Sequence, residues 1–158
     1  MGLGRERLQQ RRAAKALRFQ PTDDMTERKA REKEATVARS LVSVVDDDES
    51  VRESLPDLLK QLGFAAEVFP SAEAFLASEF VDATRCLILD IAMPGMSGPE
   101  LYRELANRRQ EIPTIFITAT GNKDVRPRLL AEGAVECLFK PFSDAALLAA
   151  LNAALRVR

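Results

Sequence analysis

Short apolar runs alternate with amphipathic segments along the chain from Ser40 onward. Most of these runs are apolar throughout, as is typical of strands that are buried on both faces of a parallel sheet. The segments between them have the longer period of helices that cover such a sheet. We predict five strands, at residues 41–45, 65–69, 86–89, 114–118 and 136–139.

Each predicted strand is followed by apolar residues at helical spacing. The first helix carries such residues from Val51 to Leu62, and Gly63 suits its C-terminal cap. Asp48 and Ser50 compete as its N-cap, the second through a capping-box pattern with Glu53. The second helix is predicted to begin at Ala72 after a Ser71 cap, and the third to follow Gly98. The fourth is predicted to lie between Asp124 and Glu132, with Pro127 in its first turn, and the last to follow a Ser143 cap.

Five strands that alternate with five helices indicate an α/β domain with one doubly wound, five-stranded parallel sheet. We expect this domain to span residues 40–158. Residues 1–39 differ from it, because segments 4–19 and 26–39 favour polar helices without a wide apolar stripe. We predict that residues 1–39 form a disordered or loosely helical N-terminal extension.

Charge is unevenly distributed along the chain. The net charge is only −1, but residues 1–39 hold 11 Lys and Arg against 6 Asp and Glu, and the remainder holds 12 against 18. A basic segment on an acidic domain can contact nucleic acid, a membrane surface or an acidic partner. We favour a solvated extension, and neither nucleic acid nor a membrane is among the expected partners.

Missing and rare residue types exclude several classes of function. The chain has no histidine, so it is not a phosphohistidine donor, and histidine-based catalysis or zinc binding is not expected. Its two cysteines, Cys86 and Cys137, lie within predicted strands and are interpreted as reduced and buried. We recognise neither a membrane span nor a signal peptide, and we expect a cytoplasmic protein.

Acidic, hydroxyl and ammonium groups follow the predicted strands. Asp46 and Asp47 follow the first strand, Asp90 follows the third, Thr118 ends the fourth and Lys140 follows the fifth. The carboxyl ends of parallel strands share one edge of the sheet, where ligands of doubly wound folds bind, so we expect these groups to converge. Clustered carboxylates repel each other and lose hydration, and oxygen ligands without histidine or cysteine favour Mg²⁺ as the cation that joins them.

Such a set of groups is suited to moving a phosphoryl group. Mg²⁺ and Lys140 can neutralise its oxygens, Thr118 can hydrogen-bond one of them, and a carboxylate can attack in line. Each residue alone has an ordinary structural explanation, such as a turn or helix cap for an aspartate. The functional interpretation is preferred because the groups occur at the same end of successive strands.

Four motifs resemble the response regulator receiver family. They are VVDDD at 44–48, LILDIAMPGMSG at 87–98, ITA at 117–119 and FKPF at 139–142, and they follow the family's order and spacing over about residues 40–156. The resemblance implies a flavodoxin-like (βα)5 fold. It also implies phosphorelay signalling, in which a sensor histidine kinase donates a phosphoryl group and the receiver then switches its binding of a partner. The segment Gly133-Ala134-Val135, which precedes Lys140, is similar to the corresponding segment of receivers that precede helix-turn-helix output domains.

The resemblance assigns roles to the residues that match the motifs. Asp90 would be the phosphoacceptor, and Mg²⁺ would be held by Asp46, Asp47, Asp90 and the carbonyl of Ala92. The chain would not be an enzyme beyond its own Mg²⁺-dependent phosphorylation and dephosphorylation.

The resemblance also implies how phosphorylation is transmitted. Thr118 would be the switch hydroxyl and Lys140 would contact the phosphoryl group. The Lys140–Pro141 bond is the candidate for the cis peptide that family structures usually have. The helix at residues 124–132, the strand at 136–139 and the last helix would form the output face for an unidentified downstream protein, and a homodimer is left open.

The sequence departs from the family pattern at two points. The switch aromatic expected three residues before Lys140 is Cys137, which puts aromatic coupling at this position in doubt. The chain ends at Arg158 directly after the last helix, so we expect a stand-alone receiver or a piece of a longer protein.

A haloacid dehalogenase is disfavoured because Ala92 stands where its second acid would be. A degenerate receiver that binds partners without phosphorylation, and DNA binding through the basic extension, were kept as weaker alternatives.

Overall fold

A computed structural model describes residues 39–119 and 123–156 of the protein. The predicted basic extension and its loosely helical segments fall on residues that, except for Arg39, lie outside the described part of the chain, so the boundary at residue 39 stays a prediction. Within the described residues, no helix is long and apolar enough to cross a membrane.

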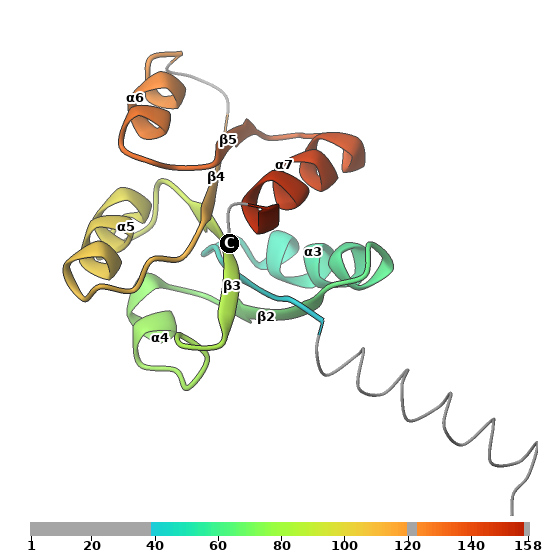
Figure 1. The fold of residues 1–158 in the computed structure, drawn as a ribbon, viewed down its shortest axis with the longest axis horizontal. Helices are drawn as coiled ribbons and strands as arrows, with labels where there is room; N and C mark the ends of the chain where they lie inside the picture. The colour runs from blue at the N-terminus through green and yellow to red at the C-terminus, as the bar shows by residue number, and fades with distance from the viewer. Residues whose placement is uncertain (1–38, 120–122, 157–158) are drawn as a thin grey trace, which may run out of the picture. The chain divides into compact units, whose positions relative to one another are not determined.

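Five parallel strands form one sheet in the order β2-β1-β3-β4-β5 (Figure 1). Four of them have the bounds that the apolar runs predicted, whereas β3 is longer at both ends than residues 86–89. The polar Thr84 at its start joins the sheet beside Leu41, next to a shift in the β1–β3 register. The strands are β1 (Leu41–Val45), β2 (Ala65–Phe69), β3 (Thr84–Asp90), β4 (Thr114–Thr118) and β5 (Glu136–Phe139).

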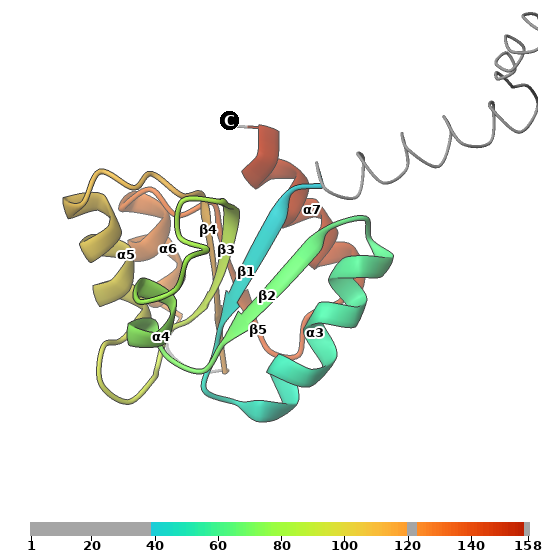
Figure 2. The same ribbon diagram turned by 90° about the horizontal axis from the view of Figure 1, so that it is seen from below.

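Five helices cover the two faces of the sheet. Helices α3 (Glu49–Gln61) and α7 (Asp144–Arg156) lie on one face, and α4 (Ala72–Leu76), α5 (Gly98–Asn107) and α6 (Val125–Ala131) lie on the other (Figure 2). Each of the five helices predicted after Ser40 is therefore present. This three-layer arrangement is the doubly wound α/β fold that the sequence predicted.

Side-chain caps fix where most of these helices begin. Asp48 caps α3 by accepting a hydrogen bond from the Ser50 backbone N–H at 2.9 Å, so the alternative capping box at Ser50 is wrong. Ser71 caps α4, and Ser143 accepts the backbone N–H of Ala146 at 3.0 Å in α7. Pro127 lies in the first turn of α6, where its missing N–H is tolerated.

The sheet separates two apolar clusters, one on each face. Successive residues of a strand point to opposite faces, and here both faces are buried. In β4, for example, Phe116 packs with the cluster under α4, α5 and α6, whereas Ile115 and Ile117 pack with the cluster under α3 and α7. Cys86 and Cys137 are free thiols buried in these clusters, as the sequence predicted.

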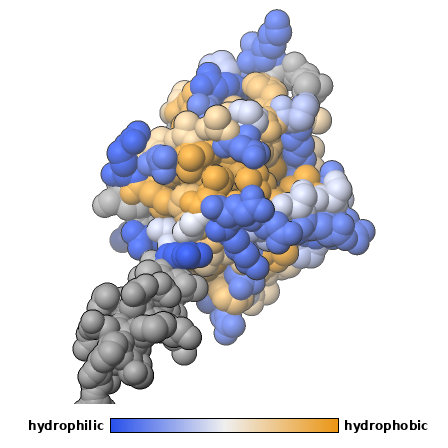
Figure 3. Space-filling model, turned by 90° about the vertical axis from the view of Figure 1, so that its right-hand side faces the viewer, coloured by the Kyte–Doolittle hydropathy of each residue, from blue (hydrophilic) through white to orange (hydrophobic). Residues whose placement is uncertain are grey.

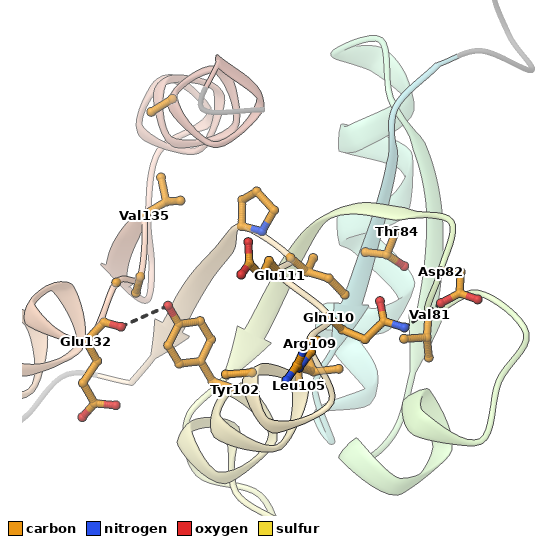
Figure 4. A pocket seen from close by; sticks show the side chains of 16 residues that line it. Val81, Asp82, Thr84, Tyr102, Leu105, Arg109, Gln110, Glu111, Glu132 and Val135 are labelled. Atoms are coloured by element: carbon orange, nitrogen blue, oxygen red, sulfur yellow. Dashed lines mark hydrogen bonds between the residues drawn. The ribbon is translucent and has the colours of Figure 1, made fainter.

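Two surface features lie away from the carboxyl ends of the strands. On the side formed by α3 and α7, Figure 3 shows an apolar area bordered by polar side chains. Partly buried apolar residues of these helices include Leu58 and Leu148. An open pocket of about 980 Å³ lies near the amino ends of β3, β4 and β5 and is lined by residues such as Thr84 and Val135 (Figure 4). Neither feature contains any of the acids that follow the strands.

Candidate functional site

The carboxyl ends of β1 and β3 meet at the point where the strand order reverses. The chain passes from β1 to β2 on one side and then returns to form β3 on the other side of β1. Connections of opposite direction leave a crevice between such neighbouring strands, and ligands of doubly wound folds bind there. Asp90 ends β3, and Asp46 is the first residue after β1.

Asp46, Asp47 and Asp90 form a carboxylate cluster at this crevice. One oxygen of each lies within 4.8 Å of the others. Asp46 is fully buried and the exposed fraction of Asp90 is 7 %, whereas Asp47 is exposed. The cluster therefore combines two desolvated carboxylates with one that faces the solvent.

Lys140 brings a positive charge to the cluster from the end of β5. Its Nζ donates a hydrogen bond to Asp46 Oδ2 at 3.0 Å and lies 3.7 Å from Asp90 Oδ1. The backbone N–H of Lys140 donates to the carbonyl of Thr118 at 2.7 Å, which ties the ends of β4 and β5 together. The following Lys140–Pro141 bond is cis, as predicted.

Asp46 is held in place by both of its carboxylate oxygens and by its backbone. Its Oδ1 accepts the backbone N–H of Asp48 at 2.9 Å, and its backbone N–H donates to the carbonyl of Phe69 at 3.1 Å. The Arg52 guanidinium donates to the Asp46 carbonyl at 2.9 Å. Arg52 was missed in the sequence; the available signal was a basic residue in the first turns of the helix that follows the acidic pair.

The electrostatics of the cluster disfavour a negative charge on Asp90. Burial, followed by the negative charge of Asp46, raises the pKa of Asp90 to about 7, although Lys140 acts in the opposite direction. Burial by itself lowers the pKa of Lys140, but the hydrogen bond to Asp46 and the charges of Asp46 and Asp90 raise it above its usual value. Lys140 is therefore positively charged at neutral pH, and the cluster has capacity for a further cation.

Comparison with known families and structures accounts for this arrangement. The profile described as the response regulator receiver domain matches residues 42–152. This chain belongs to the response regulator receiver family. Two solved structures confirm the expected flavodoxin-like receiver fold. The crystal structure of FixJ-N is 40% identical, has a TM-score of 0.67 and aligns with 74% of this chain and 94% of its own. The structure of the response regulator StyR is 44% identical, has a TM-score of 0.69 and aligns over 75% and 60% of the two chains.

Two curated bacterial proteins each match about three quarters of this chain. Nodulation protein W from Bradyrhizobium diazoefficiens is 43% identical over 116 residues, which cover 73% of this chain and 51% of that protein. The response regulator protein TodT from Pseudomonas putida is 39% identical over 118 residues, which cover 75% and 52%. The receiver chain therefore spans about half the length of the curated relatives that it matches.

The donor set of the receiver fits Mg²⁺. Three carboxylates approach one another from two strand ends, two of them are desolvated, and only oxygen donors are present in the cluster. Mg²⁺ prefers oxygen ligands and binds through one or a few carboxylates while keeping several waters. The exposed Asp47 leaves a solvent-facing side on which such waters can lie.

The remaining residues of the expected site lie on neighbouring elements. Thr118 is half-buried at the carboxyl end of β4, the strand beside β3, and Ala92 is exposed in the loop after β3. This loop starts with Ile91, whose N–H donates to the Ile117 carbonyl at 3.1 Å, and it closes at Gly98, whose N–H donates to the Ile91 carbonyl at 2.9 Å. The structure thus places both residues at the edge of the sheet that carries the carboxylate cluster.

Proposed function

We propose that Asp90 accepts a phosphoryl group in a Mg²⁺-dependent reaction and that the receiver thereby switches the binding of a partner. The observation that carries this proposal is the close approach of four charged side chains at the carboxyl ends of the strands: Asp46, Asp47, Asp90 and Lys140. In the reaction, an Asp90 carboxylate oxygen forms a bond to phosphorus while the bond from phosphorus to the donor breaks. The product is an acyl phosphate, and the donor leaves with the released electron pair.

Asp46, Asp47, Asp90 and the carbonyl of Ala92 are the proposed ligands of Mg²⁺. When bound, the ion supplies charge neutralisation for the phosphoryl oxygens. Lys140 is proposed to neutralise a further oxygen, since its ammonium group already lies 3.7 Å from Asp90. Thr118 is proposed to donate its hydroxyl hydrogen to another oxygen from the neighbouring strand. No further substrate is turned over in this scheme, so the chain acts only on its own aspartate.

The donor and the downstream partner are proposed from the family relationship. A sensor histidine kinase is the expected donor, because response regulators are among the relatives of this chain. The α6–β5–α7 face is the proposed output surface, since the ends of β4 and β5 are joined by the hydrogen bond between Thr118 and Lys140. On this face α6 and β5 are linked by the Arg126–Glu136 ion pair at 2.8 Å. A cytoplasmic location accords with these partners, and pairing of two copies through the same face is an additional outcome to be measured.

The test is intact mass after incubation with Mg²⁺ and acetyl phosphate. Wild type should gain one phosphoryl group, and EDTA or Asp90→Asn should abolish the gain. Shifts of backbone amide signals for residues 123–142 should accompany the adduct if the output face responds. An unmodified wild type, under conditions that label another receiver, would instead indicate a phosphorylation-independent binding module.

A further inference from the structure

A carboxylate outside the cluster holds the loop that carries Ala92. Glu73 lies in the first turn of α4, and its Oε2 accepts the backbone N–H of Met96 at 2.9 Å. The two residues are 23 positions apart and belong to different elements. This hydrogen bond therefore joins α4 to the β3–α5 loop, residues 91–97.

The same carboxylate also lies against the residue before Met96. Gly95 has a φ of +74°, and a Cβ atom built on it would lie 2.9 Å from Glu73 Oε2. Real Cβ atoms essentially never approach an oxygen this closely, so the carboxylate occupies the space beside the bare Gly95 backbone. The Glu73 carboxylate thus lies directly against the backbone at residues 95–96.

The two ends of the loop are held by other groups. At the base of the loop, the Gly98 N–H donates to the Ile91 carbonyl, and the Ile91 N–H donates to Ile117 of β4. Ser97 forms a capping box with Glu100 at the start of α5. Glu73 acts on the outer turn between these anchors. A loop that is fixed at its base and at its outer turn has less freedom to move a carbonyl group at Ala92.

Glu73 is well placed to hold the turn, because α4 is itself anchored. Ala72 and Phe75, on either side of Glu73 in this helix, are fully buried in the apolar cluster, and the Ser71 side chain caps the helix. The hydrogen bond from the Met96 N–H lowers the pKa of Glu73, so the carboxylate is ionised at neutral pH and the bond is charge-assisted.

We propose that Glu73 is a positioning residue for Mg²⁺ binding, which fixes the β3–α5 loop so that the Ala92 carbonyl faces the carboxylate cluster. This inference rests on the proposed function, because Ala92 is a ligand only if the cluster holds Mg²⁺. Glu73 acts through the loop backbone and does not touch the ion.

Mg²⁺ affinity, measured by isothermal titration calorimetry at pH 8, tests the proposal with a set of variants. Glu73→Ala removes the acceptor, Glu73→Asp keeps the charge but shortens the reach by one methylene, and Glu73→Gln keeps an acceptor oxygen at the original reach. Glu79→Ala is the charge-matched control, since Glu79 is an exposed acid just after α4 that makes no hydrogen bond or ion pair found among the described residues. Complete coupling of one charge-assisted hydrogen bond to ion binding would change the affinity about tenfold to a hundredfold. Glu73 acts only through the loop backbone, so we expect a smaller change of about threefold to tenfold.

The Mg²⁺ affinities of these proteins should follow a specific order. Glu73→Ala and Glu73→Asp should weaken Mg²⁺ binding about threefold to tenfold, whereas Glu73→Gln and Glu79→Ala should stay within about twofold of wild type. The opposite order, with Glu73→Asp like wild type and Glu73→Gln like Glu73→Ala, would show that Glu73 acts only through its charge and would overturn the proposal. Equal affinities for all five proteins would overturn it as well.

A second readout reports the contact directly. The amide proton of Met96 should shift upfield and exchange faster with solvent in Glu73→Ala and Glu73→Asp, but not in Glu79→Ala, with EDTA present in every sample. An unchanged Met96 amide in Glu73→Ala would contradict the contact itself. Failure of the proposed function is a separate result, because wild type would then bind no Mg²⁺ and gain no phosphoryl group from acetyl phosphate.

Discussion

Lys140 Nζ lies 3.0 Å from Asp46 Oδ2 and 3.7 Å from Asp90 Oδ1, so the ammonium group is bonded to a proposed metal ligand and only adjacent to the proposed phosphoacceptor. The two roles are coupled through one side chain. A phosphoryl group on Asp90 would draw Lys140 away from Asp46, and a cation beside Asp46 would make that transfer easier because it replaces the lost positive charge. Lys140 therefore stabilises Asp46 in the unphosphorylated protein and is available to contact a phosphoryl group on Asp90.

Loss of the Lys140 ammonium group by mutation should destabilise the fold in a solution without divalent cations. Lys140→Met leaves the fully buried Asp46 carboxylate without its charged partner, so the free energy of unfolding should fall by about 1–3 kcal/mol in EDTA. Saturating Mg²⁺ should recover part of this loss, since it also compensates Asp46. Urea unfolding with EDTA and with Mg²⁺ measures both effects. Lys60→Met, an exposed lysine at the end of α3, should change stability by only a few tenths of a kcal/mol.

The raised pKa of Asp90 makes stability depend on pH. In an unfolded chain an aspartate ionises near pH 4, whereas the pKa of Asp90 in the folded protein is about 7. Between these values the folded state keeps a proton that the unfolded state has lost. Asp90 therefore lowers the free energy of unfolding as the pH rises from about 4 to about 7, with an upper bound of about 4 kcal/mol.

Asp90→Asn should remove this penalty. In EDTA at pH 8 the variant should be more stable than wild type by about 1–3 kcal/mol, and the difference should largely disappear near pH 4. Chemical unfolding at a series of pH values gives the comparison. Asp57→Asn, at an exposed position of α3, serves as the control and should follow wild type at each pH. A pH-independent difference between Asp90→Asn and wild type would contradict the assigned pKa.

Mg²⁺ affinity should also depend on pH through Asp90. The proposed site requires the ionised carboxylate, so a proton on Asp90 competes with the ion. Below pH 7 the apparent affinity should fall about tenfold for each pH unit, and it should level off above pH 8. Calorimetric titrations at pH 6, 7 and 8 test this dependence. In Asp90→Asn the dependence over this range should be lost together with most of the affinity.

Gly98 controls the distance between the end of β3 and the start of α5. A Cβ atom at Gly98 would lie 2.2 Å from the backbone carbonyl oxygen of Asp90, and a backbone atom of β3 cannot yield without disturbing the strand. Gly98→Ala should cost about 3 kcal/mol in stability and should slow phosphorylation of Asp90. Thermal unfolding and the acetyl phosphate assay measure the two effects.

Gly63→Ala is the matched comparison for Gly98→Ala. Gly63 has a φ of +101°, so alanine is strained there, but a Cβ atom would meet nothing within 4 Å. This variant should lose about 1 kcal/mol and keep wild-type phosphorylation. Similar phosphorylation rates for both variants would show that the close approach at Gly98 has no influence on the acceptor.

Much of this fold was predictable because local signals agreed with it. Four strands have the bounds of their apolar runs, and the groups at the carboxyl ends meet because parallel strands must place these ends on one edge of the sheet. The element bounds that the sequence did not predict depend on hydrogen bonds of polar side chains. Thr84 extends β3 beyond its apolar run because its buried hydroxyl bonds Ser43 on β1 at 2.6 Å, and Asp48 rather than Ser50 caps α3.

Contacts between residues far apart in the sequence were not predictable in this way. The Lys140–Asp46 bond joins residues 94 positions apart. Which aspartate accepts the hydrogen bond from Lys140 depends on the relative positions of the strand ends, which no local pattern specifies. The Glu73–Met96 bond likewise depends on the conformation of a glycine turn and on the place of a short helix. Such contacts follow from tertiary geometry, and the sequence offered only the residue types that can form them.

The burial of both thiols has a practical consequence for measuring movement in this protein. Cys86 and Cys137 are the only cysteines of the chain, and burial raises the pKa of each, to about 12 for Cys86. Maleimide reagents react with the thiolate of an accessible cysteine, so both native residues should label slowly. A single Ala131→Cys substitution on the exposed side of α6 would therefore give a site for one fluorescent or spin label in an otherwise native background.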